Sequence, residues 1–244
     1  MKYLSYLLAS ALALALVLTS WAFVMARTLG SATYLDQHAE QAQLYQRLAA
    51  AIPEANIDPA AFRSQVQSFL PGLIDHLTKG GPAPTVDLNG APFTLTLGPA
   101  DDKVAGALGA LQPVGIVAPL SVLVLIVLIF VLLRDRRLPT LARGLLQGAV
   151  SLAISAGILW VAPTLILSAL NSPGSAQLKP VIEAFLQSVF HDMALQFGIA
   201  AVALLLVSIG VRVVHHTARL KARFIKPKEP SKRQTPTPPG AFVQ

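Results

Sequence analysis

The chain has 244 residues, of which 54% are hydrophobic and only 13% are charged, and its mean hydropathy is +0.60. This composition excludes an ordinary soluble domain, whereas several membrane-spanning segments joined by polar connectors would account for it. The formal charge of +7 could indicate a nucleic-acid partner, so the positions of the basic residues must be known before the charge is interpreted.

Four long stretches lack any charged residue, at 3–26, 114–133, 144–170 and 193–211. Each is close to the roughly 20 residues that a helix needs to cross about 30 Å of hydrocarbon. We therefore predict an all-α membrane protein with four transmembrane helices. The predicted spans cover residues 1–26, 114–133, 144–170 and 193–214.

The basic residues gather on one side of this predicted membrane. Residues 1–2, the connector 134–143 and the segment from 212 onward hold 13 Lys and Arg against two acidic residues. The positive-inside rule then places both termini in the cytoplasm, so the charge is interpreted as a topology signal and no nucleic-acid partner is expected. The chain has no cysteine, and its outward segments have no N-x-S/T acceptor, which favours a bacterial plasma membrane.

The first apolar stretch has two interpretations. Lys2 precedes it and small residues stand at Ala22 and Ala26, as in a cleaved signal peptide. Its 24 uncharged residues exceed the 7 to 15 that are usual for the apolar core of a signal peptide. We expect a retained signal anchor over 1–26, with cleavage as the alternative.

The larger outward segment, residues 27–113, carries the clearest helix signal outside the spans. Asp58 is suited to be an N-cap, and Pro59 to occupy the first helical position. The apolar residues that follow at helical spacing are Phe62, Val66, Phe69, Leu70, Leu73 and Leu77. A less apolar helical pattern covers residues 36–52, and alternating residues around 89–90 predict a short β-hairpin at 85–97.

The second outward segment, residues 171–192, has apolar residues at helical spacing that include Phe185 and Val189. Because no helix breaker separates it from the fourth span, one helix should run from residue 180 to about residue 221 and project beyond the membrane. We predict that its apolar stripe packs on the 62–77 stripe. The two segments would then form a small, mainly helical extracytoplasmic domain.

Residues that could carry chemistry are few. The four uncharged stretches contain no Asp, Glu, Lys, Arg or His, which argues against a proton or ion pathway. His38, His76 and His191 each have an acidic neighbour, and together with Asp192 they are candidate zinc ligands. A solvated polar face explains them more simply, so we predict neither a metal, nor a cofactor, nor enzymatic activity.

The leading hypothesis is a non-enzymatic envelope protein whose outward helical domain mediates assembly with a protein partner or with further copies of the chain. The residues expected to interact are Phe62, Val66, Phe69, Leu73, Leu77, Phe185 and Val189. One alternative is an oligomeric transport or channel component for an uncharged or lipid-like substrate, and a second is a metal-dependent envelope enzyme. The basic, proline-rich tail 215–244 is predicted to be disordered, and membrane lipids are expected partners.

Overall fold

The computed structural model describes residues 2–51, 58–79, 85–88, 91–94, 99–169 and 179–224. Seven helices lie within these ranges. The four long ones are α1 (Lys2–Arg27), α5 (Pro99–Leu132), α6 (Arg137–Ala169) and α7 (Lys179–Phe224). The three shorter ones are α2 (Ala32–Gln41), α3 (Leu44–Ala51) and α4 (Pro59–Lys79), which we together call the end assembly. Strand β1 (Thr85–Leu88) pairs antiparallel with β2 (Ala91–Thr94).

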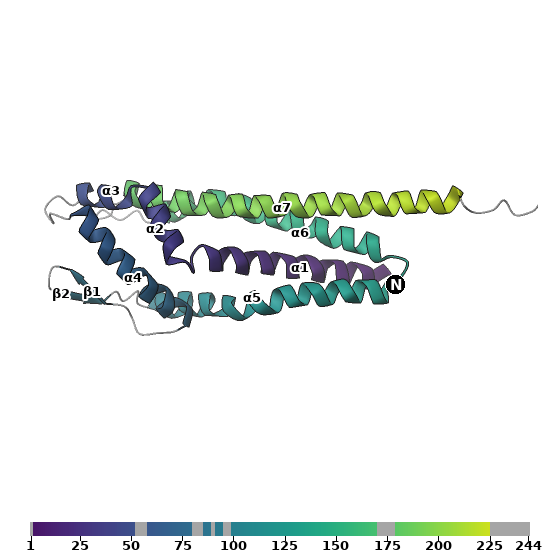
Figure 1. Cartoon of the computed structure of the whole chain (residues 1–244), viewed down its shortest axis with the longest axis horizontal. Helices are drawn as coiled ribbons and strands as arrows, with labels where there is room; N and C mark the ends of the chain where they lie inside the picture. Colours follow the sequence, from purple (N-terminus) through teal and green to yellow (C-terminus); the bar gives the residue numbers. More distant parts are fainter. Residues whose placement is uncertain are drawn as a thin grey trace, which may run out of the picture.

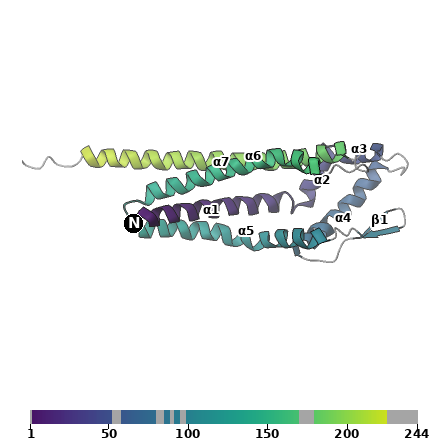
Figure 2. The ribbon, with the colours of Figure 1, turned by 180° about the vertical axis from the view of Figure 1, so that it is seen from behind.

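The four long helices lie side by side along the long axis of the molecule (Figure 1), and a view from behind shows the same arrangement (Figure 2). Each contains a segment that is long and apolar enough to cross a membrane. Large apolar side chains face outward from these segments; Leu123 is 65% exposed and Leu206 is 63% exposed. Such a surface is unfavourable in water and suits hydrocarbon. The predicted class, a helical multi-pass membrane protein, is therefore supported.

α1 occupies the centre of the bundle, between α5 on one side and α6 on the other. Leu12 of α1 is fully buried with Ile129 of α5 in one apolar cluster. Val24 of α1 is buried with Leu152 of α6 and Phe197 of α7 in another. α5 makes few contacts with α6, so within the bundle α5 is joined to α6 and α7 mainly through α1.

Small residues let α1 and α6 approach closely. Ser5, Ala9 and Ala13 of α1 are all buried. A Cβ atom added to Gly144 would lie 2.9 Å from Leu12 Cδ2 and 3.0 Å from the carbonyl oxygen of Ala9. At Gly157, further along α6, an added Cβ atom would have nothing within 4 Å.

The end assembly lies at the end of the bundle away from the N-terminus, beside the first turns of α7 (Figure 1). Asp58 caps α4 as predicted, accepting hydrogen bonds from the backbone N–H groups of Ala60 (3.2 Å) and Ala61 (3.4 Å). α4 is continuous through Pro71. The turn residues 89–90, on which the hairpin prediction depended, lie outside the described residues, as do residues 225–244 of the predicted disordered tail. Residues 215–224, which that prediction included, are helical, because α7 continues to Phe224.

The helix predicted over 36–52 is divided into α2 and α3. Gln43, between them, adopts a φ of 53°, a region that residues other than glycine seldom enter. The break redirects the chain so that Tyr45 is buried, with its hydroxyl 2.8 Å from Asp36 Oδ1. A single straight helix could not present both residues in this way.

Two further boundaries differ from the prediction. The connector predicted over 134–143 is much shorter, because α6 already begins at Arg137; Pro139 is tolerated in its first turn, where helical N–H groups have no partner in any case. The helix that contains the second span, predicted over 114–133, begins earlier, because α5 starts at Pro99. The long helix predicted from residue 180 to about 221 is confirmed by α7.

Candidate functional site

The end assembly is attached to the bundle by a polar contact between α2 and α7. Tyr34 donates its hydroxyl to Asp192 Oδ2 at 2.6 Å, and His38 Nδ1 lies 2.7 Å from Ser188 Oγ. His38 Nε2 is 3.9 Å from Asp192 Oδ2, and Gln196 donates to the same oxygen at 2.8 Å. Tyr34 and His38 are four residues apart on α2, and Ser188 and Asp192 are four residues apart on α7. Residues at this spacing lie on the same face of a helix, so one face of α2 meets one face of α7.

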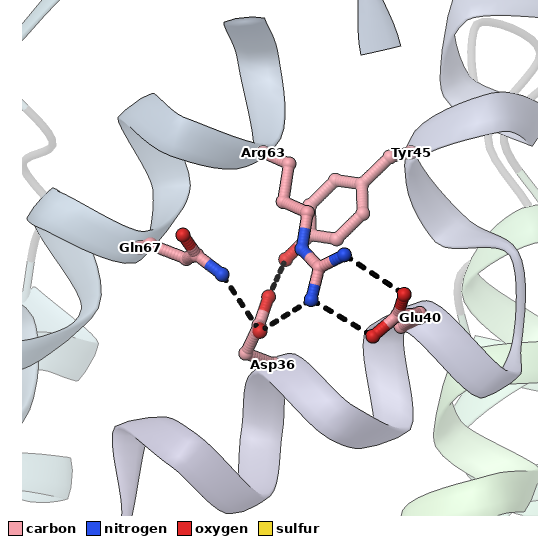
Figure 3. Close-up of polar contacts among 5 residues, drawn as sticks. All are labelled: Asp36, Glu40, Tyr45, Arg63 and Gln67. Atoms are coloured by element: carbon pink, nitrogen blue, oxygen red, sulfur yellow. Dashed lines mark hydrogen bonds and ion pairs between the residues drawn. The ribbon is translucent and has the colours of Figure 1, made fainter. Parts of the chain in front are cut away.

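A second polar network joins α2 to α4 (Figure 3). The Arg63 guanidinium forms two hydrogen bonds of 2.8 Å to the Glu40 carboxylate and one of 3.1 Å to Asp36. Gln67, one turn further along α4, donates to Asp36 Oδ2 at 2.9 Å. Tyr45 of α3 donates to the other oxygen of Asp36. Asp36 is thus the acceptor on which three helices converge.

These contacts change the proton affinity of the groups involved. Burial alone would raise the pKa of Asp36, but hydrogen bonds from Arg63, Gln67 and Tyr45 outweigh it and lower the pKa below its ordinary value of 3.8. Burial and the hydrogen bond to Asp36 raise the pKa of Tyr45 well above 10. Asp36 therefore remains a carboxylate, and Tyr45 remains a hydroxyl donor, throughout the physiological pH range.

α2 is consequently held on two sides. Tyr34 and His38 face α7, whereas Asp36 and Glu40 face α4. The charged and aromatic side chains of α2 serve these intramolecular contacts, and the arrangement fixes α4 relative to the bundle.

The candidate metal ligands are only partly brought together. His38 and Asp192 are neighbours, but His191 turns away and stacks on Trp160 of α6, with ring centroids 4.1 Å apart. His76 lies on α4. Within the described part of the chain, no group of three His, Cys, Asp or Glu side chains could hold a metal ion.

The predicted interaction residues divide into two sets. Val189 is only 2% exposed and belongs to the apolar cluster formed by α1, α6 and α7, and Phe185 packs against this cluster. Phe62, Val66, Phe69 and Leu73, which we call the α4 stripe, all remain partly exposed. Leu77 belongs to α4, but the structure does not describe its side chain.

The two stripes do not pack on each other in the predicted way. In the described residues, α4 packs on α2, α3 and the first part of α5, whereas α2 and α3 cover α7. The polar residues that position α4, Arg63 and Gln67, are absent from the predicted site. Their spacing of four on α4, matched by Asp36 and Glu40 on α2, is a signal that could have identified them.

Comparisons of the chain with protein-family models, curated proteins and solved structures found no match. The function proposed for the chain accordingly rests on the contacts of its own residues.

Proposed function

We propose that this chain is a non-enzymatic protein of the bacterial plasma membrane whose end assembly binds a protein partner through the α4 stripe. The observation that carries the proposal is the way α4 is held. Arg63 and Gln67 fix one polar edge of the helix to α2, while the apolar side chains on the adjoining face remain partly exposed. The buried core of a protein interface is more apolar than the rest of the surface and is enriched in aromatic residues such as phenylalanine, so a partly exposed apolar stripe on a fixed helix suits this role.

The orientation follows from the charges. The N-terminus, the short connection between α5 and α6, and the C-terminal end of α7 lie at the same end of the bundle (Figure 1). This end carries Arg134, Arg136 and Arg137 in and beside one short connection, for which the positive-inside rule is most reliable. The end assembly would then face the outside of the cell.

The exposed polar face of α2 and α3 supports an aqueous setting for the end assembly. Gln37, Gln41, Gln43, Gln46 and Arg47 are all exposed. Such residues are costly in hydrocarbon and well solvated in water.

The central position of α1 supports its retention as a signal anchor. Cleavage after residue 26 would remove the buried partners of both α5 and α6, including Leu12 and Val24. A protein assembled around α1 therefore needs it after insertion.

Photo-crosslinking of the full-length chain in native membranes tests the proposed interface. Replacing Phe69 by the photoreactive amino acid p-benzoylphenylalanine keeps an aromatic side chain in the α4 stripe, and irradiation should give an adduct of discrete mass. A second copy of this 25.8 kDa chain would be recognised from the mass of the adduct, which separates self-association from a different partner.

The matched control places the same amino acid at Gln46, which is exposed on the polar face of α3. Val66→Asp, one turn from Phe69, should abolish the adduct because it introduces a charge into the apolar contact. Equal adducts from positions 69 and 46, or none from position 69, would contradict the proposal.

A further inference from the structure

The end of the bundle opposite the end assembly contains a cationic cavity of about 510 Å³, formed where α1, α6 and α7 meet. Lys2, Arg136, Arg143 and Arg219 line it, together with Tyr6 and His215. An adjoining cavity of about 280 Å³ shares Arg143 and His215 and adds Arg212. Basic side chains from three different helices thus converge on one place.

No acidic residue lines either cavity among the residues that the structure describes. Asp135, in the connection between α5 and α6, is not part of the lining. The ion pairs recorded for Arg63 and His38 are both formed in the end assembly, at the far end of the bundle. Because convergent like charges repel one another, this arrangement favours an anion from outside the chain.

The geometry of the cavity suits a phosphate group. The guanidinium of Arg143 lies 4.2 Å from the centroid of the Tyr6 ring, and such stacking holds the cation in place while its N–H edge stays available for paired contacts with phosphate oxygens. α6 begins at Arg137, so the positive end of a 33-residue helix lies at the cavity. Thr140, in the first turns of α6, adds a hydroxyl to the lining.

A groove of about 510 Å³ lies between α1 and α6, two of the three helices that form the cationic cavity, further along the bundle. Its lining is largely apolar and includes Ala13, Leu14 and Val17 of α1, with Leu146 and Val150 of α6. At 1.5 Å per residue, its first residue on each helix lies about 5 Å beyond the last residue that lines the cationic cavity. This spacing suits a lipid that has its headgroup at the cavity and an acyl chain in the groove.

We propose that the cavity binds one phospholipid with a net negative charge, the phosphate being held by Arg143, Arg136 and Lys2 and an acyl chain lying in the groove between α1 and α6. The position of the cavity along the bundle, where the headgroup layer of the membrane is expected, agrees with this ligand. Tyr3 and Tyr6, 91% and 54% exposed, stand beside it, and tyrosine is enriched where a membrane helix meets the headgroup layer. The apolar groove favours a lipid over a free phosphate ion.

Native mass spectrometry of the full-length protein, titrated with phosphatidylglycerol or with zwitterionic phosphatidylcholine, tests this site. The wild-type protein should retain one phosphatidylglycerol in preference to phosphatidylcholine. Each basic residue near an anionic membrane contributes about fivefold in affinity, so the double variant Arg136→Gln with Arg143→Gln should bind about 25-fold more weakly.

The matched control is the double variant Arg134→Gln with Arg137→Gln. It removes the same charge from the same end of the bundle, yet neither residue lines the cavity, so its affinity should stay close to that of the wild type. Equal losses in the two double variants would show diffuse attraction to the basic surface and would overturn the proposed site.

Two further measurements in the same mass-spectrometry experiment test the nature of the ligand. Val150→Trp fills the groove without changing any charge and should weaken retention of phosphatidylglycerol; unchanged retention would refute the acyl-chain position. Inorganic phosphate should not displace the lipid. Displacement by phosphate at equal concentration would identify a soluble anion as the ligand and would overturn the assignment to a lipid.

Discussion

The Tyr34 hydroxyl donates a 2.6 Å hydrogen bond to Asp192, a residue 158 positions away in the sequence. The bond joins α2, at the beginning of the end assembly, to the first half of the last helix. His38 extends the contact one turn along α2, and its ring lies 4.3 Å from that of Tyr34. The end assembly is therefore docked on α7 and does not depend on the chain connection to α1 alone.

Tyr34→Phe should weaken this docking. The change removes one hydrogen bond to a partly exposed carboxylate and retains the aromatic ring, so a loss of about 1 kcal/mol is expected. Hydrogen exchange of the α2 amides should show the loss as reduced protection, confined to the end assembly.

Tyr3→Phe is the matched control, because Tyr3 is 91% exposed at the opposite end of the molecule. It should leave the protection of α2 unchanged. Protection of α2 that is the same in Tyr34→Phe and in the wild type would show that the bond to Asp192 contributes nothing to docking.

Acidification should release α4 from α2. The pKa of Asp36 is lower in the folded protein than its ordinary value of 3.8, so its contribution to stability is complete above that value and is lost as the pH falls through the folded pKa. The contribution should therefore be present at about pH 5 and should decline as the pH falls below 3.8.

Hydrogen exchange of the α4 amides in the wild type and in Asp36→Asn, compared at the same pH, isolates this effect from the intrinsic pH dependence of exchange. The wild type should be the better protected protein at about pH 5, and the difference should shrink as the pH is lowered below 3.8. A difference that persists unchanged in acid would mean that the charge of Asp36 is not what holds α4.

The sequence predicts those parts of the fold that depend on local properties. Length and hydropathy identify the four long helices, and the absence of a breaker identifies the continuity of α7. The cap at Asp58 follows from the chemistry of that residue and of Pro59. Each of these features is decided within a few turns of helix.

Features that depend on packing escape such reasoning. The break at Gln43 could not be predicted from the sequence, because no glycine or proline occurs there. The break accompanies the burial of Tyr45 and its hydrogen bond to Asp36, which depend on packing. The sequence indicates only a topology signal for Lys2, Arg143 and Arg219. Their convergence on one cavity could not be predicted, because it depends on how α1, α6 and α7 pack together. For the same reason, the sequence predicts α4 as the partner of α7, whereas α2 and α3 occupy that position.

Cysteine labelling tests the proposed orientation directly, because the chain has no cysteine of its own. Gln46→Cys places an exposed thiol in the end assembly, and Asp135→Cys places one in the connection between α5 and α6 without removing a basic residue. In intact spheroplasts, a membrane-impermeant maleimide should label position 46 and should reach position 135 only after lysis. Labelling of position 135 from outside would reverse the orientation and place the end assembly in the cytoplasm.

The close approach of α1 and α6 at Gly144 should make this glycine intolerant of even one methyl group. In Gly144→Ala, the added carbon would meet both the Leu12 side chain and the fixed carbonyl oxygen of Ala9, so the helices must separate. Overpacking of this kind costs about 1 to 3 kcal/mol, and thermal unfolding in detergent should show a lower midpoint. Gly157→Ala, on the same helix with open space around it, removes the same backbone freedom without the clash and should leave the midpoint unchanged or slightly raised. Equal midpoints for the two variants would show that α1 and α6 are not in close contact at Gly144, and the central position of α1 would then have to be abandoned.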